Sequence, residues 1–392
     1  MYFASSKTGA LATGLFLFCL AVGARGEPIV PSSDDQVIEV LPASSGNRAE
    51  ERQQRRQLAA RPDDPELAVK VARRYLDQAH ALGDPRFAGL ALAALSPWPQ
   101  PVSAPDDVLL LQATLQQYLH EFDASAASLE SLVARPSYRG QPQAWLTLAT
   151  VRRVQGRYAA SDAACERVGS AGAALHSRAC LAENAALRGD VAAARTTLDS
   201  LLREPRLPPA TQAWLLTTLA ELEERENRAA PAEAAYRAAL KLAPDTYTTL
   251  AYADFLIAQK RPAEALQVLR DESRSDAVLL RLAIAGRRAN LPGATRDIAE
   301  MRERIVLANQ RPEARALHGR EQAMFALAID GDAERAFELA RGDVALQREA
   351  LDVLVFAQAA RATGRAAALD EVRRLQVEMG LHDKRLEAVL KG

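Results

Sequence analysis

Apolar residues recur at helical spacing along most of the chain after Pro65. Leu146, Ala149 and Val154 stand at positions i, i+3 and i+8 of one such segment. Strand-like alternation is absent, and Ala, Leu, Arg and Glu, which favour helices, dominate the composition of these segments. Each segment of about 12 to 15 residues ends in a polar or glycine turn and then restarts. The pattern therefore predicts an all-α fold of antiparallel helix pairs.

The turns between these segments recur at a regular distance. Seven polar or glycine residues each follow one predicted helix and precede another, and neighbouring members are 30 to 41 residues apart. These residues are Gly156, Gly189, Asn227, Lys260, Asn290, Gly331 and Gly364. The spacing scatters around roughly 34 residues, the length of a repeat made of two helices. The sequence therefore predicts an array of repeated helix pairs.

Two segments carry the side-chain pattern that accompanies this period. In one first helix, Trp145, Leu148 and Ala149 precede the turn at Gly156, and in one second helix, residues 231–244 hold alanines around Tyr236. This motif resembles that of tetratricopeptide repeat (TPR) proteins, including exported bacterial ones of uncharacterised function. The resemblance implies a right-handed solenoid of antiparallel helix pairs, a TPR-like superhelix, over residues 61–392. The match in the first of these repeats is partial, since three positions depart from the motif: Arg152, Ser161 and Cys165.

The N-terminal residues 1–26 have the features of a cleaved signal peptide. Lys7 supplies the positive charge, residues 10–22 are apolar, and cleavage after Ala24 or Gly26 fits the small residues there. The alternative, a membrane anchor, is disfavoured because about 13 apolar residues fall short of the roughly 20 that span a bilayer. Residues 27–60, rich in Pro, Ser and charge, are predicted to be a disordered or partly helical tether, with a short helix from about Arg48. We therefore expect a periplasmic or secreted protein.

Composition and charge limit the kinds of partner. The chain has 392 residues, of which 48% are hydrophobic, and 49 basic residues balance 50 acidic ones without a dense run of one sign. A nucleic-acid partner is disfavoured, because binding phosphates requires a clustered basic face. Beyond the signal, no stretch of 18 residues is continuously apolar, so stable membrane insertion after signal cleavage is not expected.

Enzyme motifs are absent from the sequence. It contains no nucleophile elbow, phosphate-binding glycine loop or zinc-binding H-E-x-x-H segment. His176 and Cys180, four residues apart on one helix face, could bind a metal or form a nucleophilic pair, but two ligands do not make a zinc site. We therefore predict a protein without catalytic residues, metal or cofactor.

Two cysteines remain after signal cleavage, Cys165 and Cys180. They lie on either side of one predicted interhelical loop, in a compartment where disulfides persist. A bridge closing about 15 residues would contribute roughly 3 kcal/mol in the chain-entropy model. The alternative is a pair of small apolar side chains that fill the helix interface. The bridge is the prediction.

Register on the first helices predicts a binding groove. Glu183, Glu221 and Asp254 each stand six residues before a turn residue of the series. Trp214 and Tyr247 each stand thirteen residues before a turn residue, on the same helix face. Arginines are predicted to flank this centre: Arg153 on one side, and Arg287 and Arg361 on the other. We expect the three acids to be exposed, so that changing all three to Lys abolishes partner binding and leaves the fold intact. A chance run on a surface with 25% charged residues is the alternative.

These observations together predict a non-catalytic scaffold or assembly factor for protein–protein interaction. The expected partner is an extended peptide or a helix of an envelope protein, bound in the concave groove. The groove pattern does not resemble the Lys, Arg and Asn clamp with which some TPR proteins hold a terminal carboxylate. The alternative is an accessory binder or an enzyme that uses the groove for a small ligand such as a glycan, which would require several groove aromatics.

Overall fold

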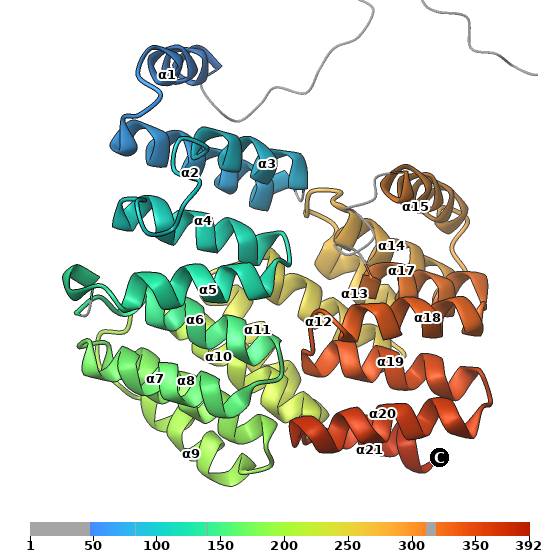
Figure 1. Ribbon diagram of the computed structural model, residues 1–392. Helices are drawn as coiled ribbons and strands as arrows, with labels where there is room; N and C mark the ends of the chain where they lie inside the picture. The colour runs from blue at the N-terminus through green and yellow to red at the C-terminus, as the bar shows by residue number, and fades with distance from the viewer. Residues whose placement is uncertain (1–47, 83, 139, 311–318) are drawn as a thin grey trace, which may run out of the picture. The chain divides into compact units, whose positions relative to one another are not determined.

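The computed structural model describes residues 48–392, apart from residues 83, 139 and 311–318 (Figure 1). It divides into two units, Met1–Glu51 and Arg52–Gly392, and the account below concerns the second unit. The predicted signal peptide and residues 27–47 of the predicted tether lie outside the described residues. The short helix expected from about Arg48 is present as α1 (Arg48–Ala60).

Every described element is helical, and no strand occurs in the described part of the chain. The first helices of the pairs are α2 (Pro65–Leu82), α4 (Asp106–Tyr118), α6 (Pro142–Val154), α8 (Ala174–Leu187), α10 (Pro209–Arg225), α12 (Thr246–Ala258), α14 (Asp276–Arg288), α17 (Gly319–Phe325) and α19 (Ala350–Ala362). The second helices are α3 (Pro85–Ala94), α5 (Phe122–Val133), α7 (Tyr158–Ser170), α9 (Val191–Leu202), α11 (Ala229–Leu242), α13 (Pro262–Leu269), α15 (Ala294–Asn309), α18 (Ala333–Val344) and α20 (Ala366–Met379). Three short elements complete the fold: the 3-10 turn η1 (Pro136–Tyr138), the π-helical turn η2 (Ala326–Asp330), which extends α17, and the last helix α21 (Lys384–Lys391). The prediction of an all-α solenoid of helix pairs is confirmed.

The turn inside each pair has one residue with left-handed backbone geometry. All seven turn residues of the periodic series have positive φ angles, between 53° and 97°. Glycine adopts this region without strain and asparagine more easily than other residues, which explains the four glycines and two asparagines among these seven. His120, between α4 and α5, takes the same geometry with φ 60° and lies 36 residues before Gly156. Histidine is an uncommon turn residue, so the sequence pattern did not reveal this earlier member.

Local capping fixes the first residues of the helices that matter for the site. Asp245 accepts a hydrogen bond of 2.9 Å from the backbone N–H of Thr248 at the start of α12. Ser275 caps α14 in the same way through Val278. Pro142 opens α6, where its missing N–H costs no helical hydrogen bond. These caps set where each first helix begins and therefore which residues face inward.

Small residues let the two helices of a pair approach closely. Ala232, Tyr236 and Ala239 of α11 are all fully buried, as the motif of residues 231–244 implies. Ser161 stands where the motif usually has alanine, and its buried hydroxyl donates a 2.8 Å hydrogen bond to the carbonyl of Ala149. The departure from the motif is therefore satisfied inside the pair, since a buried hydroxyl needs a partner.

The C-terminal helices meet the middle of the chain through loop contacts. The backbone N–H of Arg348 donates to the carbonyl of Val154 at 2.6 Å, and that of His382 donates to the carbonyl of Leu187 at 2.7 Å. These carbonyls belong to the last residues of α6 and α8, which have no acceptor role inside their own helices. Figure 1 shows α19–α21 alongside the middle helices. The C-terminal helices therefore lie against the middle repeats at the ends of α6 and α8, a contact that the register of the first helices does not predict.

Candidate binding cavity

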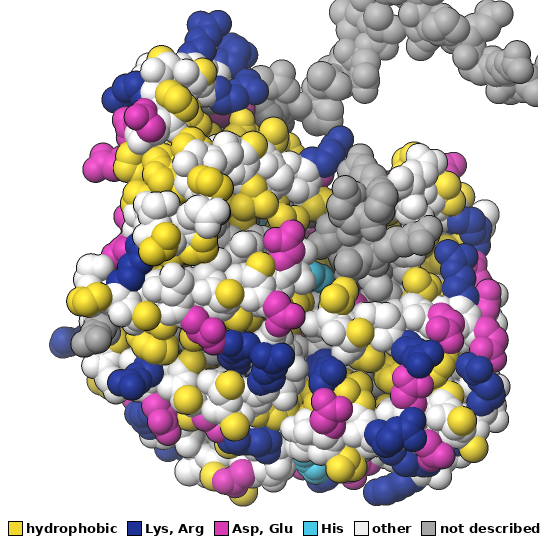
Figure 2. Space-filling view, in the orientation of Figure 1, with side chains coloured by type: hydrophobic (Ala, Val, Ile, Leu, Met, Phe, Trp, Pro, Cys, Tyr) yellow, Lys and Arg dark blue, Asp and Glu magenta, His cyan; other side chains and the backbone are white. Residues whose placement is uncertain are grey.

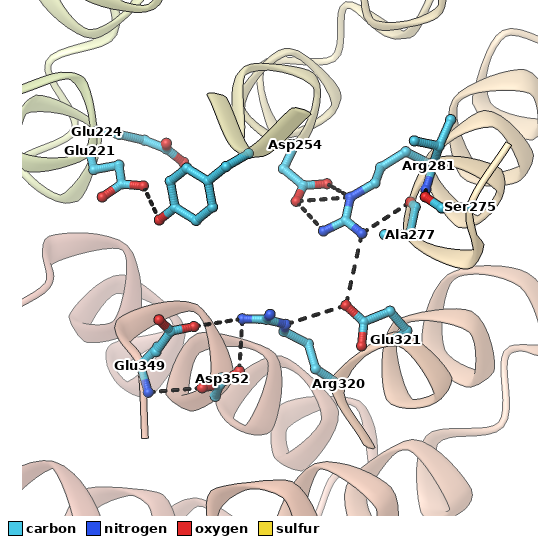
Figure 3. Close-up of polar contacts among 12 residues, drawn as sticks. Glu221, Glu224, Asp254, Ser275, Ala277, Arg281, Arg320, Glu321, Glu349 and Asp352 are labelled. Atoms are coloured by element: carbon cyan, nitrogen blue, oxygen red, sulfur yellow. Dashed lines mark hydrogen bonds and ion pairs between the residues drawn. The ribbon is translucent and has the colours of Figure 1, made fainter. Parts of the chain in front are cut away.

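A cavity of about 290 Å³ lies between the inner face of the middle repeats and the C-terminal helices. One wall comes from α6, α8, α10 and α12, and the other comes from α14, α17 and the residues that lead into α19. Figure 3 shows side chains from both walls pointing toward one another. The volume is near the lower end of the range for small-ligand pockets, roughly 300 to 1,000 Å³.

Five of the seven groove residues predicted from register line this cavity. They are Arg153, Glu183, Glu221, Tyr247 and Asp254. Counting back from the turns therefore identified one helix face, because the turn geometry is the same in each pair. The repeats bring together side chains that lie up to 101 positions apart in the sequence.

Trp214 and Arg287 lie outside this cavity. Trp214 stacks on His176 with the ring centroids 5.7 Å apart, in a neighbouring hollow of about 350 Å³ that shares Arg153 and Glu183 with the cavity. Arg287 instead donates a hydrogen bond to the carbonyl of Ile329 at the end of η2. Arg361 likewise binds the carbonyl of Val389. Their placement as a flank of the acidic centre is therefore corrected, since both guanidinium groups bind the ends of other helices.

The predicted acids are paired inside the cavity. Arg153 and Glu183 form an ion pair of 2.8 Å, and Arg281 binds Asp254 at 2.7 Å. The side chains of Glu183 and Asp254 are only 16% and 18% exposed. The expectation of an exposed, uncompensated acidic surface is therefore wrong. Lysine at either position would place two cations together in a half-buried site, so the triple lysine variant would not preserve the fold.

Glu221 has an unusual protonation equilibrium. Burial raises the pKa of this carboxyl to about 7, while the positive charge of Arg225 opposes the rise. The hydroxyl of Tyr247 donates a 2.6 Å hydrogen bond to Glu221, and the nearby carboxylate holds the pKa of Tyr247 well above its ordinary value. The side chain of Tyr247 is nevertheless 62% exposed, so water reaches the cavity.

A continuous set of ion pairs crosses the cavity from one wall to the other (Figure 3). Arg281, held by Asp254, contacts Glu321 at 4.0 Å, and Glu321 contacts Arg320 at 3.6 Å. Arg320 then binds Asp352 at 3.0 Å. These pairs connect α12 and α14 with α17 and α19.

The far end of this network is deeply buried. Asp352 is 0% exposed in its side chain, and its carboxylate accepts a hydrogen bond of 2.8 Å from the backbone N–H of Glu349. Burial raises the pKa of Asp352 well above its ordinary value and raises the pKa of neighbouring Asp343 to about 7. Arg320 opposes both shifts. The three groups act as one unit that holds the start of α19 against α17.

Arg225 is the functional candidate that register reasoning missed. It is the last residue of α10, is only 8% exposed and lines the cavity. Among the described residues, it has no hydrogen-bond or ion-pair partner. One signal in the sequence could have found it. Two residues before their turns, the preceding repeats have Val154 and Leu187, both of which line the same cavity, and the next repeat has an arginine there.

Charged residues at the start of α21 and just before it bind the end of α10. The carboxylate of Glu226 binds both His382 and Lys384 at 2.7 Å. Arg385 forms an ion pair with Glu224, which also accepts a 2.8 Å hydrogen bond from Tyr236. We refer to residues 382–385 as the C-terminal clasp. This clasp lies at the end of α10, next to the cavity wall.

The predicted disulfide is present. Cys165 of α7 and Cys180 of α8 are bonded, with their Cα atoms 5.8 Å apart. The bridge connects one helix pair to the next and lies beside the hollow that contains Trp214. It therefore fixes the position of α8, which carries Glu183.

The described residues contain neither a candidate metal site nor a candidate membrane-spanning helix. No group of three or more His, Cys, Asp or Glu side chains is placed to hold a metal ion. No helix among residues 48–392, gaps excepted, combines the length and apolar character that crossing a bilayer requires. On the face shown in Figure 2, basic and acidic side chains are interspersed.

Among the known proteins compared, only solved structures are similar to this chain. No protein-family model and no curated protein matches the sequence. A tetratricopeptide repeat protein from Parabacteroides merdae is 15% identical over 65% of this chain and 98% of that chain, with a TM-score of 0.37. Yeast Tom70 is 11% identical over 85% and 81% of the two chains, with a TM-score of 0.38, and the P58(IPK) TPR domain is 12% identical over 80% and 92%, with a TM-score of 0.20. The helix pairs of this chain carry the fold assignment by themselves.

Proposed function

We propose that the chain is a non-catalytic scaffold for protein–protein interaction that is exported to the periplasm. Its partner is a segment of an envelope protein, held at the inner face of α6–α12. Export rests on the predicted signal peptide of residues 1–26. The absence of enzyme motifs and the array of helix pairs favour binding over catalysis.

One observation carries the proposal: four successive first helices deliver side chains to a single water-accessible cavity. Arg153, Glu183, Glu221 and Asp254 come from α6, α8, α10 and α12, one from each. Charged and aromatic side chains that converge in this way provide several contacts to one bound segment. The cover formed by the C-terminal helices implies that the partner either reaches the cavity by an inserted side chain or displaces the clasp.

A glycan site is less well supported than a protein site. It would need several aromatic rings in the cavity, and Trp214 stacks on His176 in the neighbouring hollow instead. Three tyrosines line the cavity, but Tyr158 and Tyr236 are only 4% and 0% exposed, so Tyr247 is the one that offers an accessible ring. The polar lining suits charged groups of a protein partner better.

Site-specific photo-crosslinking in the native envelope tests this proposal. A photoreactive phenylalanine derivative replaces Tyr247, whose accessible ring lies in the cavity. The matched control places the same derivative at Lys241, an exposed residue of α11. We expect mass spectrometry to find one envelope protein that crosslinks from position 247 and not from position 241. Equal crosslinking from both positions, or from neither, would contradict a partner at the inner face.

A further inference from the structure

We propose that Arg225 is an anchor for a carboxylate group that enters the cavity, supplied by an Asp or Glu side chain of the bound segment. This inference rests on the proposed function, because it names the chemistry of the partner at the same cavity. It assigns a recognition role to the cavity arginine that has no partner within the described residues.

Arg225 differs from other arginines of the cavity because no carboxylate of the described residues lies within ion-pair distance of its side chain. Arg281, Arg320 and Arg153 all line the cavity, and each is paired with a carboxylate of the chain at 3.0 Å or less. Arg225 is more deeply buried than most cavity arginines, with 8% exposure, yet it has no such partner. A buried arginine without an acceptor is costly, since guanidinium groups are almost always paired when they lose water. A ligand carboxylate would supply the missing acceptor.

The second argument is the position of Arg225 relative to the cavity walls. It ends α10, one turn after Glu221 and next in sequence to Glu224 and Glu226, which bind the C-terminal clasp. The neighbouring repeats have apolar side chains, Val154 and Leu187, at the equivalent position. Arg225 therefore adds a cation at a position that is apolar in these repeats, and little water screens its attraction for a ligand anion.

The third argument selects a carboxylate over a doubly charged phosphate. The charge of Arg225 acts on Glu221 and Tyr158, and the carboxylates of Glu183 and Glu349 act on both of these groups. Their negative charges would repel a dianion. A single carboxylate meets less repulsion, and Glu221 can carry a proton near neutral pH and donate a hydrogen bond to the second carboxylate oxygen. The cavity of about 290 Å³ accommodates a side chain of this size.

Binding of defined probes tests the inference without knowledge of the natural partner. The probes are an end-blocked alanine pentapeptide with one central glutamate, the same peptide with glutamine, and free butyrate, which carries a single negative charge. Titrations of the full mature chain at low ionic strength are followed by NMR of the probe. The variants are Arg225→Met, which keeps the length of the side chain, and Arg203→Met, a control at an exposed arginine outside the cavity.

We expect the glutamate peptide to bind and the glutamine peptide to bind at least about tenfold more weakly. Arg225→Met should remove this preference, and Arg203→Met should retain it. Tighter binding of butyrate than of the glutamate peptide would support the same anchor and identify a free small acid as the source of the carboxylate. Equal binding of glutamate and glutamine peptides, or an unchanged preference in Arg225→Met, would overturn the inference.

The melting temperature of Arg225→Met provides a second, independent readout. An arginine kept for binding leaves the fold unharmed when it is removed, whereas a structural arginine does not. We expect Arg225→Met to melt at the wild-type temperature or above it. A clear decrease would overturn the inference. Crosslinking from position 247 combined with the loss of any acid preference would retain the proposed function and reject Arg225 as its anchor.

Discussion

The two walls of the cavity are built in different ways. The wall formed by α6, α8, α10 and α12 repeats one register, so equivalent positions before each turn deliver equivalent side chains. The wall formed by α17 and α19 has no such repetition and is held by buried charges around Arg320 and Asp352. The first wall is specified by local sequence period, whereas the second depends on contacts between residues far apart in the chain. The comparison supports our proposal that the first wall presents groups to a ligand and that the second wall closes over them.

The largest expected effect comes from breaking the buried charges of the second wall. Asp352→Ala removes the partner of Arg320 and leaves the backbone N–H of Glu349 without its acceptor. We expect the free energy of unfolding to fall by about 4 kcal/mol, since removal of one member of a buried pair leaves an uncompensated charge. Chemical denaturation measures this loss.

Asp352→Asn is the matched control for this substitution. It keeps the shape and one oxygen acceptor of the side chain, so we expect less than half of the loss seen with alanine. Equal losses in both variants would show that shape, and not the ion pair, holds the second wall.

Removal of the disulfide tests how much the covalent bridge stabilises the first wall. In the variant with both Cys165 and Cys180 changed to alanine, we expect a loss of about 3 kcal/mol, the chain-entropy value for a loop of this length. Thermal unfolding with and without reductant measures it. The wild-type protein should lose stability when reductant is added, and the double variant should not respond. A response of the double variant to reductant would contradict this origin of the loss.

The dependence of stability on pH tests the raised pKa of Glu221 in the cavity. In the folded chain Glu221 holds its proton up to a pKa of about 7, above the ordinary 4.5, so the folded state binds more protons between these values. The free energy of unfolding should therefore fall as pH rises from about 4.5 to 7, and level off above that. Asp343, with its pKa raised to about 7, acts in the same direction.

Glu221→Gln isolates the contribution of this one carboxyl to the pH dependence. We expect the variant to lose about 1 kcal/mol of the fall between pH 4.5 and 7, a value reduced for the water that reaches the cavity. Glu338→Gln, at an acid with 62% exposure, should leave the profile unchanged. Superimposable profiles for Glu221→Gln and the wild-type protein would contradict the raised pKa.

The smallest expected effect concerns the C-terminal clasp. Lys384 is 48% exposed and binds Glu226, so Lys384→Ala should lower global stability by only about 0.5 kcal/mol. The same change should speed hydrogen exchange in α21, because the clasp opens locally. Lys391→Ala, which breaks a more exposed pair within α21, is the control. Faster exchange throughout the molecule would show that the clasp is not a local device.

The sequence predicted what is local in this fold. The turn period located seven positive-φ residues, and counting back from them placed four residues in one cavity: Glu183, Glu221, Tyr247 and Asp254. The sequence did not predict the contacts between distant segments. The N–H of His382 donates to the carbonyl of Leu187, and Arg281 binds Asp254. Both contacts result from tertiary packing, which a helical period does not encode. The same reason explains why the acids were expected to be exposed. The significance of Arg225 also became visible only when every other cavity arginine had been assigned its partner.

The central claim, that the C-terminal segment closes the inner face of the middle repeats, is tested most directly by an engineered disulfide between Gly189 and His382. A Cβ atom at Gly189 would lie 3.6 Å from the Cβ atom of His382, within the range of roughly 3.5 to 4.5 Å for disulfides. Gly172 shares the left-handed geometry and has no atom within 4 Å of its Cβ position, so Gly172→Cys with His382→Cys is the control. After mild oxidation of the folded protein, we predict a peptide crosslinked between positions 189 and 382 by mass spectrometry, and none between positions 172 and 382. Absence of the 189–382 crosslink in folded protein would contradict the claim.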